Sequence, residues 1–176
     1  GLNYLLQVTE NSPASSYNIT DQTGTQIQTK LGANIDVILT AQFFSNVLDY
    51  TKHDAALNAR VKKNLNTCVS KIQRAQDRNG NIAGAGWAGV LQSSFATNAL
   101  ESAQTQGAAV DEAALDRSRE SQKNNYNAKT GDVKTEMGAG VMLYSVSGSA
   151  RASAKEARRV EEEISKAKRE GKLSQN

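Results

Sequence analysis

The residues with the widest chemical repertoire in this chain are its single cysteine and its single histidine, Cys68 and His53. A thiolate and an imidazole together could bind zinc or form a nucleophile and its base. Cys68, however, falls on the apolar face of a predicted helix, which is typical of a buried structural cysteine. His53 falls in a polar joint between two predicted helices, which indicates a surface or capping histidine. We therefore expect no metal site, no cofactor and no catalytic residue, and hence no enzyme.

Three further features admit both a functional and a structural interpretation. Asp36 could be a functional acid, but it stands in the first turn of a predicted helix, where the helix dipole favours a carboxylate. Trp87 could line a pocket, but a lone tryptophan is more often a packing anchor. The glycines around Asn79-Gly80-Asn81 and Gly84-Ala85-Gly86 lack the spacing of a phosphate-binding loop, so we interpret this segment as a turn.

The composition favours long helices and a core of small aliphatic residues. The chain has 176 residues, one proline, 38% hydrophobic residues and only 5% aromatic residues. A single proline argues against a turn-rich β-sandwich and for helices, whose interiors exclude proline. No apolar run approaches the ~20 residues that span a bilayer. The sequence therefore predicts an all-α protein without a transmembrane segment.

The net charge of +3 is concentrated after position 150. That segment contains eight Lys and Arg residues and five Asp and Glu residues, so the rest of the chain is neutral. Its basic residues alternate with glutamates and have no aromatic neighbours, unlike the basic surfaces that bind nucleic acid. We therefore expect no nucleic-acid partner and interpret the segment as a solvated helix, with peripheral contact to an anionic membrane as the alternative.

Apolar residues recur at three- and four-residue steps over most of the chain, which predicts amphipathic helices. Clusters of Asn, Asp and Gly predict turns near Gly24, Gly80 and Gly131. After each turn comes an apolar helix and then a more charged one, a repeat that is typical of stacked helix pairs. The predicted helices cover 34–50, 55–76, 87–104, a segment that Asp111 caps, a segment that starts near Met137, and 151–170.

Two parts of this repeat are less regular. Residues 10–30 hold the only proline and are predicted to be irregular, after the last turns of a helix at the N-terminus. Ser and Gly residues at 145–149 predict a break or bend before the charged helix 151–170. A β-strand at 141–146 is the alternative, because that segment is rich in β-branched and aromatic residues. We therefore divide the chain into helical repeats over 1–150 and a charged C-terminal helix and tail over 151–176.

The second turn and the helix after it resemble a known family. Gln76 and Gly80 are spaced as in the Gln-x3-Gly-x-Trp turn of the squalene cyclase and prenyltransferase repeats, with Ile82 in place of the aromatic residue. The small-residue stretch that starts at Trp87 is similar to an inner helix of those repeats, and Gly107 is similar to the joint with the outer helix. The resemblance implies an α/α toroid, a ring of inner and outer helices, of which this chain supplies about three α-α hairpins.

The catalytic groups of that family are missing from this sequence. It has no DxDD cluster to protonate an alkene, and few aromatic residues to line a cavity for a carbocation. The Cys-Gly-Glu-Gln thioester of complement-type toroid domains is absent as well. The resemblance therefore implies a fold without implying the activity.

A partial ring leaves the apolar flanks of its first and last helix pairs uncovered. We therefore expect a non-catalytic structural or interaction subunit that completes its packing with a protein partner or as a homo-oligomer. The candidate interaction residues are Trp87, Arg158, Arg159, Val160 and Ile164. The alternatives are a fragment of a toroid enzyme that acts on an isoprenoid or other apolar substrate, and an adaptor whose basic tail binds anionic surfaces. The abundant neutral amides favour the cell envelope, the periplasm or a secreted location, with the cytoplasm as the alternative.

Overall fold

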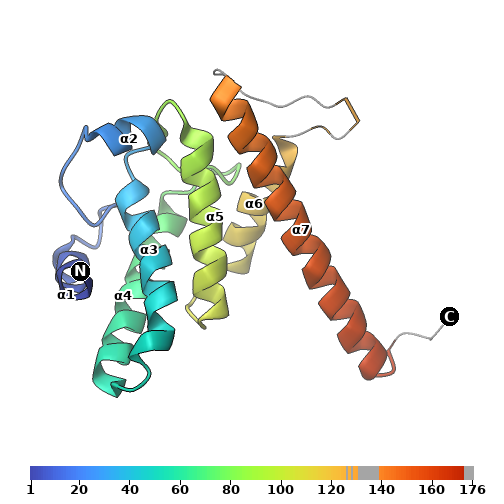
Figure 1. The fold of residues 1–176 in the computed structure, drawn as a ribbon, viewed down its shortest axis with the longest axis horizontal. Helices are drawn as coiled ribbons and strands as arrows, with labels where there is room; N and C mark the ends of the chain where they lie inside the picture. Colours follow the sequence, from blue (N-terminus) through green and yellow to red (C-terminus); the bar gives the residue numbers. More distant parts are fainter. Residues whose placement is uncertain (126, 128, 131–138, 173–176) are drawn as a thin grey trace.

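The computed structural model describes residues 1–125, 127, 129–130 and 139–172. Over these residues the chain folds into helices joined by turns and contains no β-strand, which confirms the all-α prediction (Figure 1). The predicted turn near Gly131 and the predicted start near Met137 lie outside the described residues.

The first half of the chain forms α1 (Leu2–Asn11), α2 (Gln26–Leu31), α3 (Ile35–Val47), the short 3-10 helix η1 (Leu48–Thr51) and α4 (Ala55–Arg74). Asp54 caps α4 as predicted, because its side chain accepts a hydrogen bond from the Leu57 N–H at 2.9 Å. The prediction of an irregular segment over 10–30 is wrong at α2. That helix begins with a capping box, in which the side chains of Thr25 and Gln28 each accept from the other's backbone N–H.

Three further helices complete the described fold: α5 (Gly89–Thr105), α6 (Glu112–Asn124) and α7 (Ala139–Arg169). Asp111 caps α6 as predicted, accepting from the Ala113 N–H at 3.0 Å. The predicted break at 145–149 is wrong, because α7 is continuous through it, and position 150 lies inside this helix. A Cβ on Gly148 would lie 3.3 Å from Ser94 Oγ, so the small residue here allows close packing on α5 instead of ending the helix.

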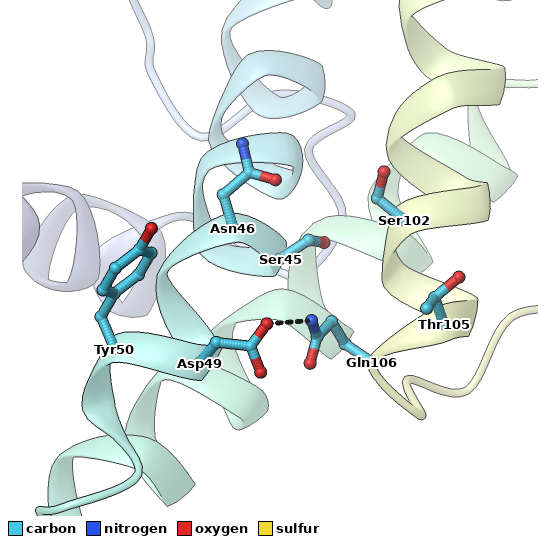
Figure 2. A pocket seen from close by; sticks show the side chains of 7 residues that line it. All are labelled: Ser45, Asn46, Asp49, Tyr50, Ser102, Thr105 and Gln106. Atoms are coloured by element: carbon cyan, nitrogen blue, oxygen red, sulfur yellow. Dashed lines mark hydrogen bonds between the residues drawn. The ribbon is translucent and has the colours of Figure 1, made fainter.

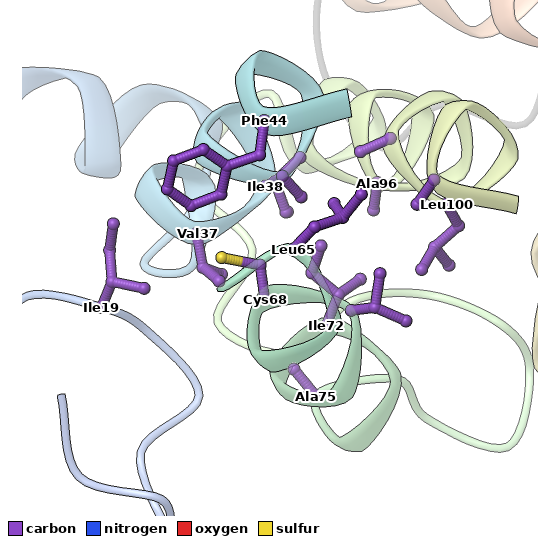
Figure 3. Packing of buried hydrophobic residues seen from close by; sticks show 14 of the residues in the cluster. Ile19, Val37, Ile38, Phe44, Leu65, Cys68, Ile72, Ala75, Ala96 and Leu100 are labelled. Atoms are coloured by element: carbon purple, nitrogen blue, oxygen red, sulfur yellow. The ribbon is translucent and has the colours of Figure 1, made fainter. Parts of the chain in front are cut away.

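Helix α3 lies at the centre of the fold, with α4 and α5 packed against it (Figure 1). Helix α1 packs on α4, and α6 and α7 pack on α5 and on each other. Figure 3 shows the apolar core that α3, α4 and α5 share. Side chains at its centre have no exposed surface: Val37, Ile38, Phe44, Leu65, Cys68, Ala96 and Leu100. Alanines on α5 leave room for the larger side chains of α3 and α4, as the small-residue pattern predicts.

The turns before α3 and α5 are joined by hydrogen bonds, which fix the position of α3 relative to α5. The Ala33 N–H donates to the Gly84 carbonyl at 2.7 Å. Gln92 is fully buried beneath these turns, and its Oε1 accepts from the Asn34 N–H at 3.0 Å. Gly32 has a φ of +142°, and a Cβ on it would lie 2.2 Å from Gln92 Oε1. Only glycine fits this position, because both the backbone conformation and the space exclude a side chain.

The two residues that carry the family resemblance, Gln76 and Gly80, tie the second turn to α6. Gln76 Nε2 donates to the Ala114 carbonyl at 2.8 Å and to Ser118 Oγ at 2.6 Å. Gly80 has a φ of +88°, and a Cβ on it would lie 2.2 Å from the Arg117 carbonyl oxygen. Gln76 and Gly80 therefore both bring the second turn into direct contact with α6, which comes after α5 in the chain.

Candidate interaction surfaces

The structure separates the two residues with catalytic potential. Cys68 is fully buried in the core, and burial raises the pKa of its thiol to about 12. The thiol therefore stays protonated at neutral pH and is a poor nucleophile or metal ligand, which confirms its structural interpretation. His53 is exposed in the turn before α4. Within the described ranges, no three His, Cys, Asp or Glu side chains come together in a way that could hold a metal ion.

A polar groove of about 500 Å³ lies between the ends of α3 and α5 (Figure 2). Of the described residues that line it, Asp49 alone is charged, and hydrogen bonds from Lys52 and from Gln106 lower the pKa of this carboxyl. The hydroxyls of Ser45 and Thr105 each donate at 3.0 Å to a carbonyl of their own helix. Neither hydroxyl is therefore paired with a base, and the groove lacks the geometry of nucleophilic catalysis.

A second groove, of about 360 Å³, is lined by α1, α3 and the loop after α1. We call it the α1–α3 groove. Its apolar walls are Tyr4, Leu5 and Val8 from α1, Ile19 from the loop, and Leu39 and Phe43 from α3. Tyr4 is 67% exposed, Leu39 42% and Phe43 36%. Exposed apolar side chains that gather around a concave surface are typical of a binding site.

Among the described residues, Asp36 is the only charged one that lines the α1–α3 groove. It lies in the first turn of α3, as the sequence predicts. Its Oδ2 accepts from Gln28 Nε2 at 2.7 Å and from Asn18 Nδ2 at 3.1 Å. Among the described residues no group hydrogen-bonds to Oδ1, and no cation lies within ion-pair distance of either oxygen. Asp36 therefore combines a structural role with a carboxylate that has no ion-pair partner among the described residues, in a groove with apolar walls.

At the other side of the molecule, Glu101 of α5 joins three helices. Its carboxylate is almost fully buried and accepts from three cations: Arg119 of α6 at 3.3 Å, and Arg151 and Lys155 of α7 at 3.0 and 2.5 Å. Arg151 also donates to the Ser94 carbonyl of α5 at 3.2 Å. We call this group the Glu101 cluster. It fixes the first half of α7 against α5 and α6.

The second half of α7 extends beyond the rest of the fold (Figure 1). Arg159 pairs with Glu112, the first residue of α6, at 3.4 Å. Past this point α7 continues for residues 160–169, about 15 Å at the rise of an α-helix. We call 160–169 the α7 overhang. Its two large apolar side chains, Val160 and Ile164, are 43% and 42% exposed although they lie four residues apart on one face.

The structure brings together four of the five candidate interaction residues and leaves the fifth elsewhere. Arg158, Arg159, Val160 and Ile164 lie in or next to the α7 overhang. Trp87 precedes α5 and is half-exposed, with Lys30 Nζ of α2 5.5 Å from its ring centre. Trp87 thus keeps about half of its surface exposed, and it lines neither of the two grooves described above.

Sequence reasoning missed the α1–α3 groove and the Glu101 cluster. A signal for the groove was present, because Leu39 and Phe43 are apolar but lie outside the face of α3 that carries Ile38 and Phe44. A helix that is apolar on two faces needs a second covering surface. No comparable signal marks Glu101, because its partners lie on two other helices far along the chain.

No helix in the part of the chain that the structure describes is both long enough and apolar enough to cross a bilayer. Comparisons with models of protein families, with curated proteins and with solved structures gave no match to this chain.

Proposed function

We propose that this protein is a non-catalytic structural or interaction subunit, built from helix pairs in the manner of a partial α/α toroid. It binds a protein partner or further copies of itself. The α7 overhang is the main contact surface. The observation that carries the proposal is the exposure of Val160 and Ile164 on a helix that outruns every neighbour in the described fold.

The energetics of this helix support the proposal. The part of α7 that packs on α5 and α6 provides the first turns of this helix, but most helices in proteins owe their stability to the burial of an apolar face along their length. Residues 160–169 have only surface ion pairs, such as Lys166 with Glu170 at 3.9 Å, which contribute little. A partner that covers Val160 and Ile164 would bury this apolar face and so stabilise residues 160–169.

The alternatives from the sequence have less support. An enzyme would need a nucleophile, an acid or a base at a cavity. In the polar groove the hydroxyls of Ser45 and Thr105 donate to carbonyls of their own helices, and that of Ser102 donates to the side-chain amide of Gln42. An adaptor for anionic surfaces would need a continuous basic face, whereas Glu161, Glu162 and Glu163 interrupt the basic residues of the overhang.

Photo-cross-linking in cells that naturally make the protein tests the proposal. A benzophenone side chain at position 164 should give a discrete adduct with a protein, which mass spectrometry identifies. The matched control is position 27 on α2, since Ile27 is also a large apolar side chain and is 48% exposed. Equal labelling at both positions, or none at 164, would contradict the proposed function.

A further inference from the structure

The partner of the α7 overhang can be specified further, as an inference that rests on the proposed function. We propose that the overhang of one copy docks in the α1–α3 groove of a second copy of this chain. Val160 and Ile164 meet Phe43 and Leu39, and Lys168 pairs with Asp36.

The two surfaces match in the order and spacing of their side chains. Asp36, Leu39 and Phe43 follow one another along one side of α3 and line the groove, together with the buried Thr40 of the same helix. Along one face of the overhang, Val160, Ile164 and Lys168 follow at four-residue steps. With the two helices antiparallel, both sets run apolar, apolar, charged in the same direction. Their lengths, about 10.5 Å on α3 and about 12 Å on the overhang at 1.5 Å per residue, agree to within about a third of a turn.

The charges are complementary as well. Asp36 lies in an apolar groove without a cation, and Lys168 has no ion-pair partner among the residues that the structure describes. A cation brought to Asp36 would meet a carboxylate that Gln28 and Asn18 already hold in place. Since the surrounding apolar side chains exclude water, this pair would be stronger than an ion pair on an open surface.

The overhang that fills the groove must come from another copy. Within one chain α1 and α3 lie on one side of the fold and α7 on the other, with α5 between them (Figure 1). Groove and overhang are different surfaces, so the contact is heterologous: each copy offers one of each. A short helix in a groove is smaller than a standard interface, and we expect a dissociation constant on the order of tens of micromolar.

Mixing two interface variants of the 176-residue chain tests this arrangement. In sedimentation velocity over the micromolar range, the wild-type chain should self-associate, whereas Phe43→Glu and Ile164→Glu should each be monomeric. An equimolar mixture should form a 1:1 dimer, because the first variant keeps its overhang and the second keeps its groove. Tyr4→Glu on the opposite wall of the groove should reproduce the effect of Phe43→Glu if the latter unfolds, which circular dichroism would reveal.

A charge reversal tests the register of the contact. Lys168→Glu should weaken self-association about tenfold, and mixing this variant with Asp36→Lys should recover it through the reversed pair. Arg158→Glu is the matched control, because it makes the same charge change on the same helix outside the face of Val160 and Ile164 and should leave association unchanged.

The outcomes separate this inference from the proposed function. Loss of association in Ile164→Glu but not in Phe43→Glu would mean that overhangs pair with each other, which overturns the groove assignment only. A wild-type chain that stays monomeric throughout overturns the second copy as partner. In that case an adduct from position 164 to a different protein would still support the proposed function, and the lack of any adduct would overturn both.

Discussion

The two halves of this protein are held together by different interactions. In the first half, α3, α4 and α5 share a core of aliphatic and aromatic side chains without exposed surface (Figure 3). In the second half, the described contacts that fix α7 to α5 and α6 include two groups of ion pairs, the Glu101 cluster and the pair of Lys123 with Glu156 at 2.7 Å.

This difference predicts different responses to solution conditions. Burial of apolar surface is not weakened by the screening of charges and scales with the area removed from water. Ion pairs also contribute to the stability of the fold, but salt screens and weakens those that lie at the surface. We therefore expect the second half to unfold at a lower denaturant concentration than the first, since local stability follows local packing. Added salt should also destabilise the second half more than the first.

The largest expected effect comes from the apolar half. Phe44→Ala removes the bulkiest fully buried side chain and should lower the free energy of unfolding by about 4 kcal/mol, through lost burial and the cavity left behind. Urea denaturation followed by circular dichroism measures this loss. Phe43→Ala is the matched control, because the neighbouring ring faces the α1–α3 groove and should cost far less. Equal losses in both variants would show that the core is not centred where the structure places it.

The next prediction tests whether the two halves open independently of each other. Glu101→Ala leaves three cations together without their carboxylate and should cost about 3 kcal/mol, since an uncompensated buried charge is expensive. Hydrogen exchange should accelerate in α7 and α6 while α3 and α4 stay protected. Glu112→Ala removes an exposed partner of Arg159 and should have little effect. Uniform acceleration over all helices would mean that the fold opens as one unit.

The smallest effect is a pH dependence within the first half. Hydrogen bonds from Arg60 and Asn64 lower the pKa of Glu10 to about 2, from an ordinary value of 4.5. Because the folded-state pKa is lowered, the stabilisation by Glu10 is complete above pH 4.5 and is lost as the pH falls towards 2.

The melting temperature of Glu10→Gln should therefore lie slightly below that of the wild type at pH 6 and converge with it at pH 2. Glu161→Gln, at an exposed carboxylate on α7, should leave the melting temperature unchanged at both pH values. A difference between Glu10→Gln and the wild type that persists at pH 2 would point to a role of Glu10 other than its charge.

Features that depend on residues close to one another in the sequence were predictable from it. The periodicity located α3, α4 and α5, and the caps at Asp54 and Asp111 were placed correctly. Helix α2 was missed because six residues give too short a periodicity, and its stability rests on the Thr25 capping box. The continuity of α7 was missed because local propensity disfavours Gly148, whereas packing against Ser94 favours it.

The candidate surfaces were predictable only in part, for the same physical reason. The apolar face of the α7 overhang is visible in the sequence, since Val160 and Ile164 belong to one helix. The α1–α3 groove combines Tyr4 with Phe43, and nothing in the local pattern indicates that these two helices face each other. The Glu101 cluster joins three helices and depends in the same way on the tertiary arrangement.

The unbroken length of α7 has a mechanical consequence. Its last ion pair with α6 is made by Arg159, and the helix continues from there to Arg169 as a straight extension. A rotation of about 10° at Arg159 would displace the end of α7 by about 3 Å, because residues 159–169 span about 15 Å at the rise of an α-helix. A small change in the geometry of the ion pairs that fix α7 would therefore produce a larger displacement of the C-terminal end of the helix.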